Sequence, residues 1–186
     1  MASFGDSLPP SRRGAYRHVM PHLTPAGAAP PPGPTRARPL EELRGFGTNP
    51  GSLRALVYVP ADLPRGAPLV VALHGCGQNA TGFDRGTGWS DLADRFGFAL
   101  LLPEQRRGNH GQNCFQWFEA DATTRDRGEV ASVRAMVEAM VTRHGLDRRR
   151  IFVTGLSAGG AMTAALLACY PEVFAAGAVV AGLPFG

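Results

Sequence analysis

The chain of 186 residues contains no lysine, so all 19 of its basic residues are arginine. They face 15 acidic residues, which leaves a net charge of only +4. No stripe of basic residues alternates with aromatic side chains, so the sequence gives no sign of a nucleic-acid partner. The exclusive use of arginine as the basic residue extends through the whole sequence, so we infer no binding function from it.

Long hydrophobic runs are missing too. No segment reaches the roughly 18 apolar residues that cross a bilayer, and the first thirty residues lack the apolar core of a secretory signal. We therefore expect no membrane partner, and a cytoplasmic location if Met1 is the true start.

Cysteine is scarce. Cys76, Cys114 and Cys169 are too few for a disulfide scaffold and lack the spacing of metal ligands, so we expect no metal site. Cys169 lies in an apolar helical pattern and is interpreted as a small buried hydrophobe. Cys76 and Cys114 fall in predicted loops, where the sequence is compatible with a disulfide or with two free thiols.

Histidine is absent after Ser157, and Glu172 is the only later carboxylate. This absence matters because residues 155–159 read Gly-Leu-Ser-Ala-Gly, the G-x-S-x-G form of a nucleophile elbow. In the fold that uses this elbow, the acid and the histidine of the catalytic triad follow the serine in the chain. The sequence therefore predicts a nucleophile, Ser157, flanked by Gly155 and Gly159, without its general base.

The chain divides into two parts at about residue 50. Residues 1–50 hold 10 of the 16 prolines and little hydrophobic periodicity, which predicts a disordered or extended tail. From residue 51 strands alternate with helices, so we expect an α/β domain over 51–186 with a mostly parallel sheet and helices on both faces. The expected strands are 53–59, 69–73, 98–102 (stopped by Pro103), 151–153 and 175–181, and the expected helices are 88–96, 130–141 and 158–170.

A second candidate site follows the strand at 69–73, at His74-Gly75-Cys76-Gly77-Gln78. An elbow serine needs two N–H donors for the negative charge that develops on the carbonyl oxygen of its substrate. The N–H groups of Cys76 and Ala158 are the candidates. His74 could be a base, but it belongs to this loop and precedes the nucleophile, so a structural role for its ring is favoured.

The same loop also matches the dinucleotide fingerprint G-x-G-x-x-G/A, through Gly75, Gly77 and Ala80. That motif opens a helix directly, whereas residues 81–88 are interpreted as a loop because they are rich in glycine. The acidic residue expected about 20 positions later is missing as well. A nucleotide-binding oxidoreductase is therefore the weaker interpretation.

Aromatic residues gather in the long predicted loop at 104–127, within Asn113-Cys114-Phe115-Gln116-Trp117-Phe118. They could line a substrate pocket or pin the loop to the core, and the sequence does not choose between the two. Residues 126–129 are interpreted as the start of a helix rather than as an acid/base pair.

Together these blocks resemble the polyhydroxybutyrate (PHB) depolymerase family of esterases, which is close to the feruloyl and acetylxylan esterases. The resemblance covers about residues 50–186 and rests on four blocks: residues 74–78, residues 114–118 with Arg127-Gly128-Glu129, residues 155–162, and Tyr170-Pro171-Glu172-Val173-Phe174. It implies an α/β-hydrolase fold and a cofactor-free serine esterase of short hydroxyalkanoate polyesters or related esters, in a family whose members are often secreted.

The resemblance also implies roles for particular residues. Ser157 is the nucleophile, the N–H groups of Cys76 and Ala158 form the oxyanion hole, and His74, Gly75 and Trp117 contact the substrate. A disulfide between Cys76 and Cys114 becomes the favoured state. The family's catalytic Asp and His would lie beyond residue 186, so we expect a sheet without its last strands and weak activity at best. An inactive fragment, or a binding module that keeps the fold, is the alternative.

Overall fold

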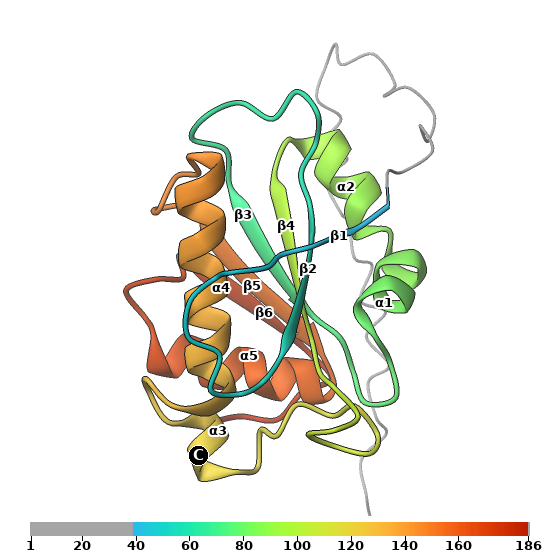
Figure 1. The fold of residues 1–186 in the computed structure, drawn as a ribbon, viewed down its shortest axis with the longest axis vertical. Helices are drawn as coiled ribbons and strands as arrows, with labels where there is room; N and C mark the ends of the chain where they lie inside the picture. The colour runs from blue at the N-terminus through green and yellow to red at the C-terminus, as the bar shows by residue number, and fades with distance from the viewer. Residues whose placement is uncertain (1–38, 186) are drawn as a thin grey trace, which may run out of the picture. The chain divides into compact units, whose positions relative to one another are not determined.

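The computed structural model describes residues 39–185, which belong to one compact unit of the chain. Their centre is one six-stranded sheet with the order β1-β2-β4-β3-β5-β6 (Figure 1). The four strands from β4 to β6 run parallel, and β1 and β2 join them antiparallel. The strands are β1 (Glu41–Glu42), β2 (Arg54–Tyr58), β3 (Leu69–Leu73), β4 (Ala99–Glu104), β5 (Ile151–Leu156) and β6 (Ala176–Val180).

Helices cover both faces of this sheet, as the alternation of elements predicts (Figure 1). They are α1 (Ala80–Thr87), α2 (Trp89–Phe96), α3 (Ala120–Thr123), α4 (Gly128–His144) and α5 (Ala158–Cys169). One apolar core lies between the sheet and the helices α4 and α5 and includes Met136, Met140 and Met162. The other lies beneath α1 and α2 and includes Phe83 and Ala93.

Helix α4 shows how the apolar pattern fixes this packing. Val130, Val133, Val137 and Met140 repeat at helical spacing and are completely buried in the larger core. Gly145 ends the helix in the left-handed conformation (φ 61°), and its N–H bonds to the Val141 carbonyl. The predicted helix at 130–141 is therefore confirmed.

Three local predictions were wrong. Residues 80–87 form α1 instead of a loop, because Asn79 accepts a hydrogen bond from the Gly82 N–H at the helix start and Phe83 anchors the helix in the core. Strand β4 runs through Pro103 to Glu104; β3 pairs with β4 only as far as Leu101, so the missing N–H of Pro103 disturbs no ladder on that side. The long loop also contains the short helix α3.

The folded part begins before residue 51. Strand β1 pairs with β2, and Leu43 is buried in the larger core. The prediction of a tail up to residue 50 is therefore wrong for residues 39–50, since pairing with a neighbouring strand offsets the weak local signal. The rest of that predicted tail, residues 1–38, lies outside the described residues.

Strand β6 forms one edge of the described sheet. It pairs with β5 on one side, and all five of its residues are exposed. Val179 and Val180 keep about half of their surface in contact with solvent. An apolar edge of this kind is what the sequence predicts for a sheet without its last strands.

Candidate active site

Two glycines make the turn at Ser157 possible. A Cβ on Gly155 would lie 2.2 Å from the carbonyl oxygen of Gly159, and a Cβ on Gly159 would lie 2.4 Å from that of Leu73. Any side chain at either position would collide with backbone. The chain can therefore pass from β5 into α5 within a single residue, as the G-x-S-x-G pattern predicts.

Ser157 itself holds a strained conformation at this turn. Its φ of 54° and ψ of −116° lie in a region that residues with a side chain rarely adopt, and the residue is exposed. The Ser157 N–H donates to the Val180 carbonyl (2.9 Å), so the end of β6 supports the turn. The hydroxyl stands at the carboxyl edge of the sheet beside the N-terminus of α5, where the helix dipole favours negative charge.

The loop after β3 packs directly against this turn. A Cβ on Gly75 would lie 3.6 Å from the Cβ of Ser157 and 3.4 Å from the Leu156 carbonyl oxygen. Gly75 therefore lies against the Ser157 turn, and its lack of a side chain lets the two turns approach each other. Its contact with substrate stays a prediction.

Two N–H groups beside Ser157 are free to bind an anion. Within residues 39–185, the backbone N–H groups of Cys76 and Ala158 donate to no protein acceptor. Ala158 opens α5, where the first N–H groups of a helix have no partner within it. The sequence predicts these same two N–H groups as the donors of an oxyanion hole.

A disulfide ties the loop after β3 to the loop after β4. Cys76 and Cys114 are bonded in the structure, with 4.2 Å between their Cα atoms, which is the pairing that the family resemblance implies. The Gly77 N–H also donates to the Gln112 carbonyl (2.6 Å). The segment that carries the Cys76 N–H is thereby held from its far side.

The ring of His74 cannot contact a substrate. Its side chain is fully buried, Nδ1 lies 2.8 Å from the Gly75 carbonyl oxygen, and Nε2 accepts from the Gln105 N–H at 3.1 Å. Burial lowers the pKa of His74, which keeps the ring neutral. The expectation that His74 binds substrate is therefore wrong for its side chain, while the favoured structural role agrees with these contacts.

The aromatic loop residues divide between core and surface. Trp117 is half-buried and packs against the larger core, and its ring meets that of Phe118 edge to face. Phe118 is 53% exposed and also contacts the ring of His110. The interpretation that the aromatics pin the loop thus holds for Phe115 and Trp117, which lie in or against the larger core. The contact of Trp117 with substrate stays a prediction.

Sequence reasoning missed a buried polar network behind the two loops. Glu129, expected only at a helix start, is 1% exposed and accepts hydrogen bonds from Gln105 and Gln116. Burial raises the pKa of Glu129 to about 7, against the lowering effect of these two hydrogen bonds. A carboxylate in the first turn of a helix is ordinarily exposed, so the helical pattern gives no sign that Glu129 is buried. The one signal in the sequence is that Glu129 belongs to a block of the family resemblance.

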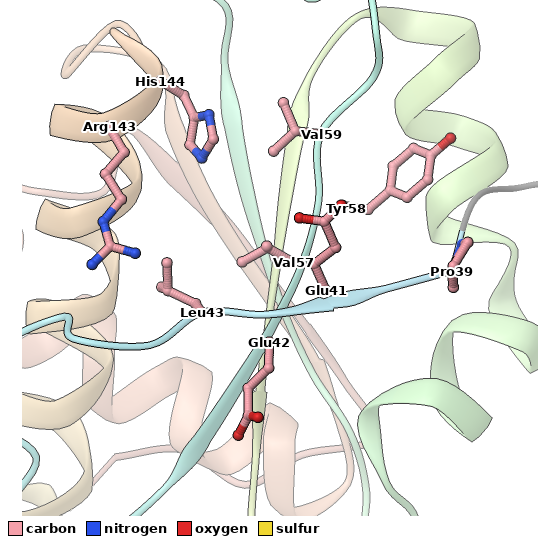
Figure 2. A pocket seen from close by; sticks show the side chains of 9 residues that line it. All are labelled: Pro39, Glu41, Glu42, Leu43, Val57, Tyr58, Val59, Arg143 and His144. Atoms are coloured by element: carbon pink, nitrogen blue, oxygen red, sulfur yellow. The ribbon is translucent and has the colours of Figure 1, made fainter.

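A cavity between β1, β2 and the end of α4 lies apart from Ser157. Arg143 and His144 extend from α4 toward the strands, and Glu41 and Val57 line the same cavity (Figure 2). Because α4 ends just before β5 begins, this cavity lies at the amino edge of the parallel strands, away from the loops that carry Ser157.

Neither a metal centre nor a membrane span is found in the part of the chain that the structure describes. No group of three or more His, Cys, Asp or Glu side chains within residues 39–185 is arranged to hold a metal ion. None of the helices described is both long and apolar enough to cross a bilayer.

The fold and the site define an α/β-hydrolase domain with the nucleophile elbow of serine hydrolases. Residues 53–186 match the family model described as Esterase PHB depolymerase. The chain belongs to this esterase family, as its sequence blocks predict.

Known proteins of this kind resemble most of the described chain. Poly(3-hydroxyalkanoate) depolymerase C from Paucimonas lemoignei is 46% identical over 146 residues, which are 78% of this chain and 35% of that protein. Feruloyl esterase B from Talaromyces stipitatus is 37% identical over 80% of this chain and 41% of its own length. The solved acetyl xylan esterase from Aspergillus awamori superimposes with a TM-score of 0.76 at 30% identity, over 80% of this chain and 54% of its own.

The chain therefore spans about half or less of the length of these relatives. They confirm the predicted α/β-hydrolase fold. The same relatives argue against a dinucleotide-binding protein. The predicted loop at residues 81–88, which also counted against it, was wrong, however: a helix, α1, does begin at Ala80.

Proposed function

We propose that this chain carries the nucleophile and oxyanion hole of a serine esterase that hydrolyses carboxylic esters through an acyl-enzyme. One observation carries the proposal: Ser157 is exposed on a strained elbow, beside two N–H groups that have no protein acceptor within residues 39–185. Strain of this kind persists only where the surrounding structure enforces it.

The chemistry follows from these positions. The Ser157 hydroxyl loses its proton to a base and attacks the ester carbonyl, whose oxygen becomes negatively charged. The N–H groups of Cys76 and Ala158 stabilise that charge, and loss of one such donor typically lowers the rate about 10²–10³-fold. The tetrahedral intermediate then breaks its bond to the ester oxygen, which takes the proton back from the base and leaves as the alcohol. Water attacks the acyl-enzyme, again with proton transfer through the base, to release the acid and restore Ser157.

The relatives guide the choice of substrate. The first is named for poly(3-hydroxyalkanoate), and others are named as feruloyl and acetylxylan esterases. All of these names denote carboxylic esters. Short hydroxyalkanoate esters, as oligomers or polymer, are our first choice because the depolymerase has the highest identity of the three relatives compared above.

No general base for Ser157 is found among the described residues 39–185. Three histidines lie in the described residues, and none forms a hydrogen bond with Ser157. His74 is buried with both nitrogens engaged, and His110 accepts from the Gln112 and Cys114 N–H groups. We therefore expect the 186 residues alone to hydrolyse p-nitrophenyl butyrate barely above background.

Added imidazole provides the test, because it can act as the absent base. The chain and its Ser157→Ala variant are compared with p-nitrophenyl butyrate over a range of imidazole concentrations. We expect an extra, saturable rate and a butyryl adduct on the tryptic peptide that begins at Ile151, both absent from the variant. Equal rates and no adduct would contradict the proposal. Robust turnover without imidazole that Ser157→Ala abolishes would support an esterase whose base lies within the chain.

A further inference from the structure

The strongest unassigned feature is the buried carboxylate of Glu129. It is 1% exposed, and none of the ion pairs within residues 39–185 involves it. A buried carboxyl group without a cation is unfavourable unless its oxygens are hydrogen-bonded. Here Oε1 accepts from Gln105 Nε2 at 2.5 Å and Oε2 accepts from the Gln116 N–H at 2.9 Å. Glu129 thus joins the start of α4 to both ends of the loop after β4.

Gln105 links Glu129 to Cys114 and to His74 through hydrogen bonds. Besides its contact with Glu129, its Nε2 donates to the Cys114 carbonyl at 3.1 Å, on the residue that shares the disulfide with Cys76. Its Oε1 accepts from Asn109 Nδ2 at 2.7 Å, which fixes the amide orientation. The backbone N–H of Gln105 donates to Nε2 of His74. One side chain and one peptide group therefore link Glu129 to the loop after β3.

The ring of His74 orients the peptide group between Gly75 and Cys76, and with it the Cys76 N–H. Because its Nε2 accepts, its Nδ1 carries the proton and donates to the Gly75 carbonyl at 2.8 Å. The described chain contains no cis peptide bond. In a trans peptide the N–H points opposite to the C=O of the preceding residue. The Gly75 carbonyl also accepts from the Gln78 N–H at 3.2 Å. By holding this carbonyl on the buried side, His74 therefore helps to direct the Cys76 N–H away from the core, in the loop that packs against Ser157.

We propose that Glu129 is a positioning residue for oxyanion stabilisation: acting through Gln105 and His74, it fixes the peptide group that presents the Cys76 N–H. This inference rests on the proposed function for its catalytic consequence. Its structural content, a buried hydrogen-bond path from Glu129 to the peptide between Gly75 and Cys76, can be measured independently of any ester.

The test compares Glu129→Gln with Glu119→Gln as a matched control. Both exchanges remove a carboxylate at nearly constant volume, but Glu119 is exposed. The amide that replaces the Glu129 carboxylate has one accepting oxygen for two donors, so one contact is lost. The readout is the buried Gln105 N–H, which donates to His74 Nε2. We expect its amide hydrogen exchange to become at least tenfold faster in Glu129→Gln and to stay unchanged in Glu119→Gln.

The catalytic readout is the Ser157-dependent acylation rate with added imidazole. We expect about a tenfold decrease in the limiting rate for Glu129→Gln, with the half-saturating ester concentration unchanged, because a misdirected donor weakens the transition state more than substrate binding. The double variant Gln105→Glu with Glu129→Gln exchanges amide and carboxylate and restores their contact, but the carboxylate at 105 cannot donate to the Cys114 carbonyl. It should recover part of the rate lost in Glu129→Gln, which a general loss of stability would not allow. It also keeps the test open if Glu129→Gln alone does not fold.

The outcomes separate this inference from the proposed function. If the unaltered chain shows no Ser157-dependent acylation, the proposed function fails and hydrogen exchange at Gln105 still decides the positioning role. Unchanged exchange at Gln105 in Glu129→Gln would overturn the inference. Faster exchange with an unchanged acylation rate would overturn it too, because the loop would then depend on Glu129 without any effect on its oxyanion donor.

Discussion

Gly155 and Gly159 lie so close together that a Cβ on Gly155 would be 2.2 Å from the carbonyl oxygen of Gly159. We predict that Gly155→Ala lowers the free energy of unfolding by about 3 kcal/mol or more, since backbone cannot move aside as a flexible side chain can. Gly86→Ala is the matched control, because its Cβ would meet nothing within 4 Å in helix α1. It should be neutral or stabilise by about 0.5–1 kcal/mol. Urea unfolding of the three proteins measures the difference, and equal stability of Gly155→Ala and the unaltered chain would contradict the description of the elbow.

Strain at Ser157 gives a second prediction. Its φ of 54° favours glycine, so Ser157→Gly should be more stable than Ser157→Ala by about 1–2 kcal/mol. Both variants remove the hydroxyl, and only the glycine relieves the backbone. Thermal unfolding of the pair provides the measurement. A more stable alanine variant would show that the turn stores no strain.

The elbow could be predicted from the sequence because its signals are local. Gly155, Ser157 and Gly159 follow an apolar strand and precede a helix, so the motif and its context can be read from one short stretch of the chain. The N–H donors follow by the same reasoning, since Cys76 comes shortly after a parallel strand and Ala158 opens a helix.

The missed features depend on contacts that are distant in sequence. Glu129 is buried because the loop containing Gln105 and Gln116 folds over the start of α4. Helix α1 contains two glycines, which weaken its propensity, and it is stabilised by the cap at Asn79 and by the burial of Phe83. Strand β1 has only two residues and forms because β2 lies beside it. Neither the composition nor the hydrophobic periodicity of the sequence predicts these tertiary contacts.

The disulfide between Cys76 and Cys114 predicts a defined peptide map. Cleavage after arginine should give one non-reduced species that joins peptides 66–85 and 108–125. Reduction should lower the free energy of unfolding by about 2–4 kcal/mol, because the bond closes a loop with a sequence separation of 38. Reducing the double variant Cys76→Ser with Cys114→Ser serves as the control and should change nothing. Two free thiols in the non-reduced map would reject the bond.

The exposed edge at β6 predicts self-association. Its five residues are exposed and apolar, and its outer backbone groups have no partner strand among the described residues. Val179→Lys should reduce concentration-dependent light scattering, because a lysine on an edge strand opposes pairing with another edge. Thr142→Lys adds the same charge at an exposed position of α4 and should have no such effect. Equal scattering by both variants would exclude the β6 edge as the cause.

Glu129 also predicts a pH dependence of stability. Burial raises the pKa of its carboxyl from 4.5 to about 7, so between these values the folded chain binds more protons than the unfolded chain. The free energy of unfolding must then fall as pH rises through this window. A shift of this size corresponds to a contribution on the order of 3 kcal/mol. Below pH 4.5 both states are protonated and the contribution is fully present; above pH 7 it is lost.

The comparison of unaltered chain and Glu129→Gln isolates this effect. Other groups titrate in the same window, notably His74, whose lowered pKa destabilises the fold as pH falls below about 6.5. Contributions from groups whose contacts Glu129→Gln leaves unchanged are shared by both proteins and cancel in the difference between their free energies of unfolding. A change at His74 acts in the opposite direction, since its contribution is lost as pH falls rather than as pH rises. We expect that difference to shift in favour of the glutamine variant as pH rises from about 4.5 to about 8. A difference independent of pH would mean that Glu129 ionises in the folded chain as readily as in water, and its burial would then need another explanation.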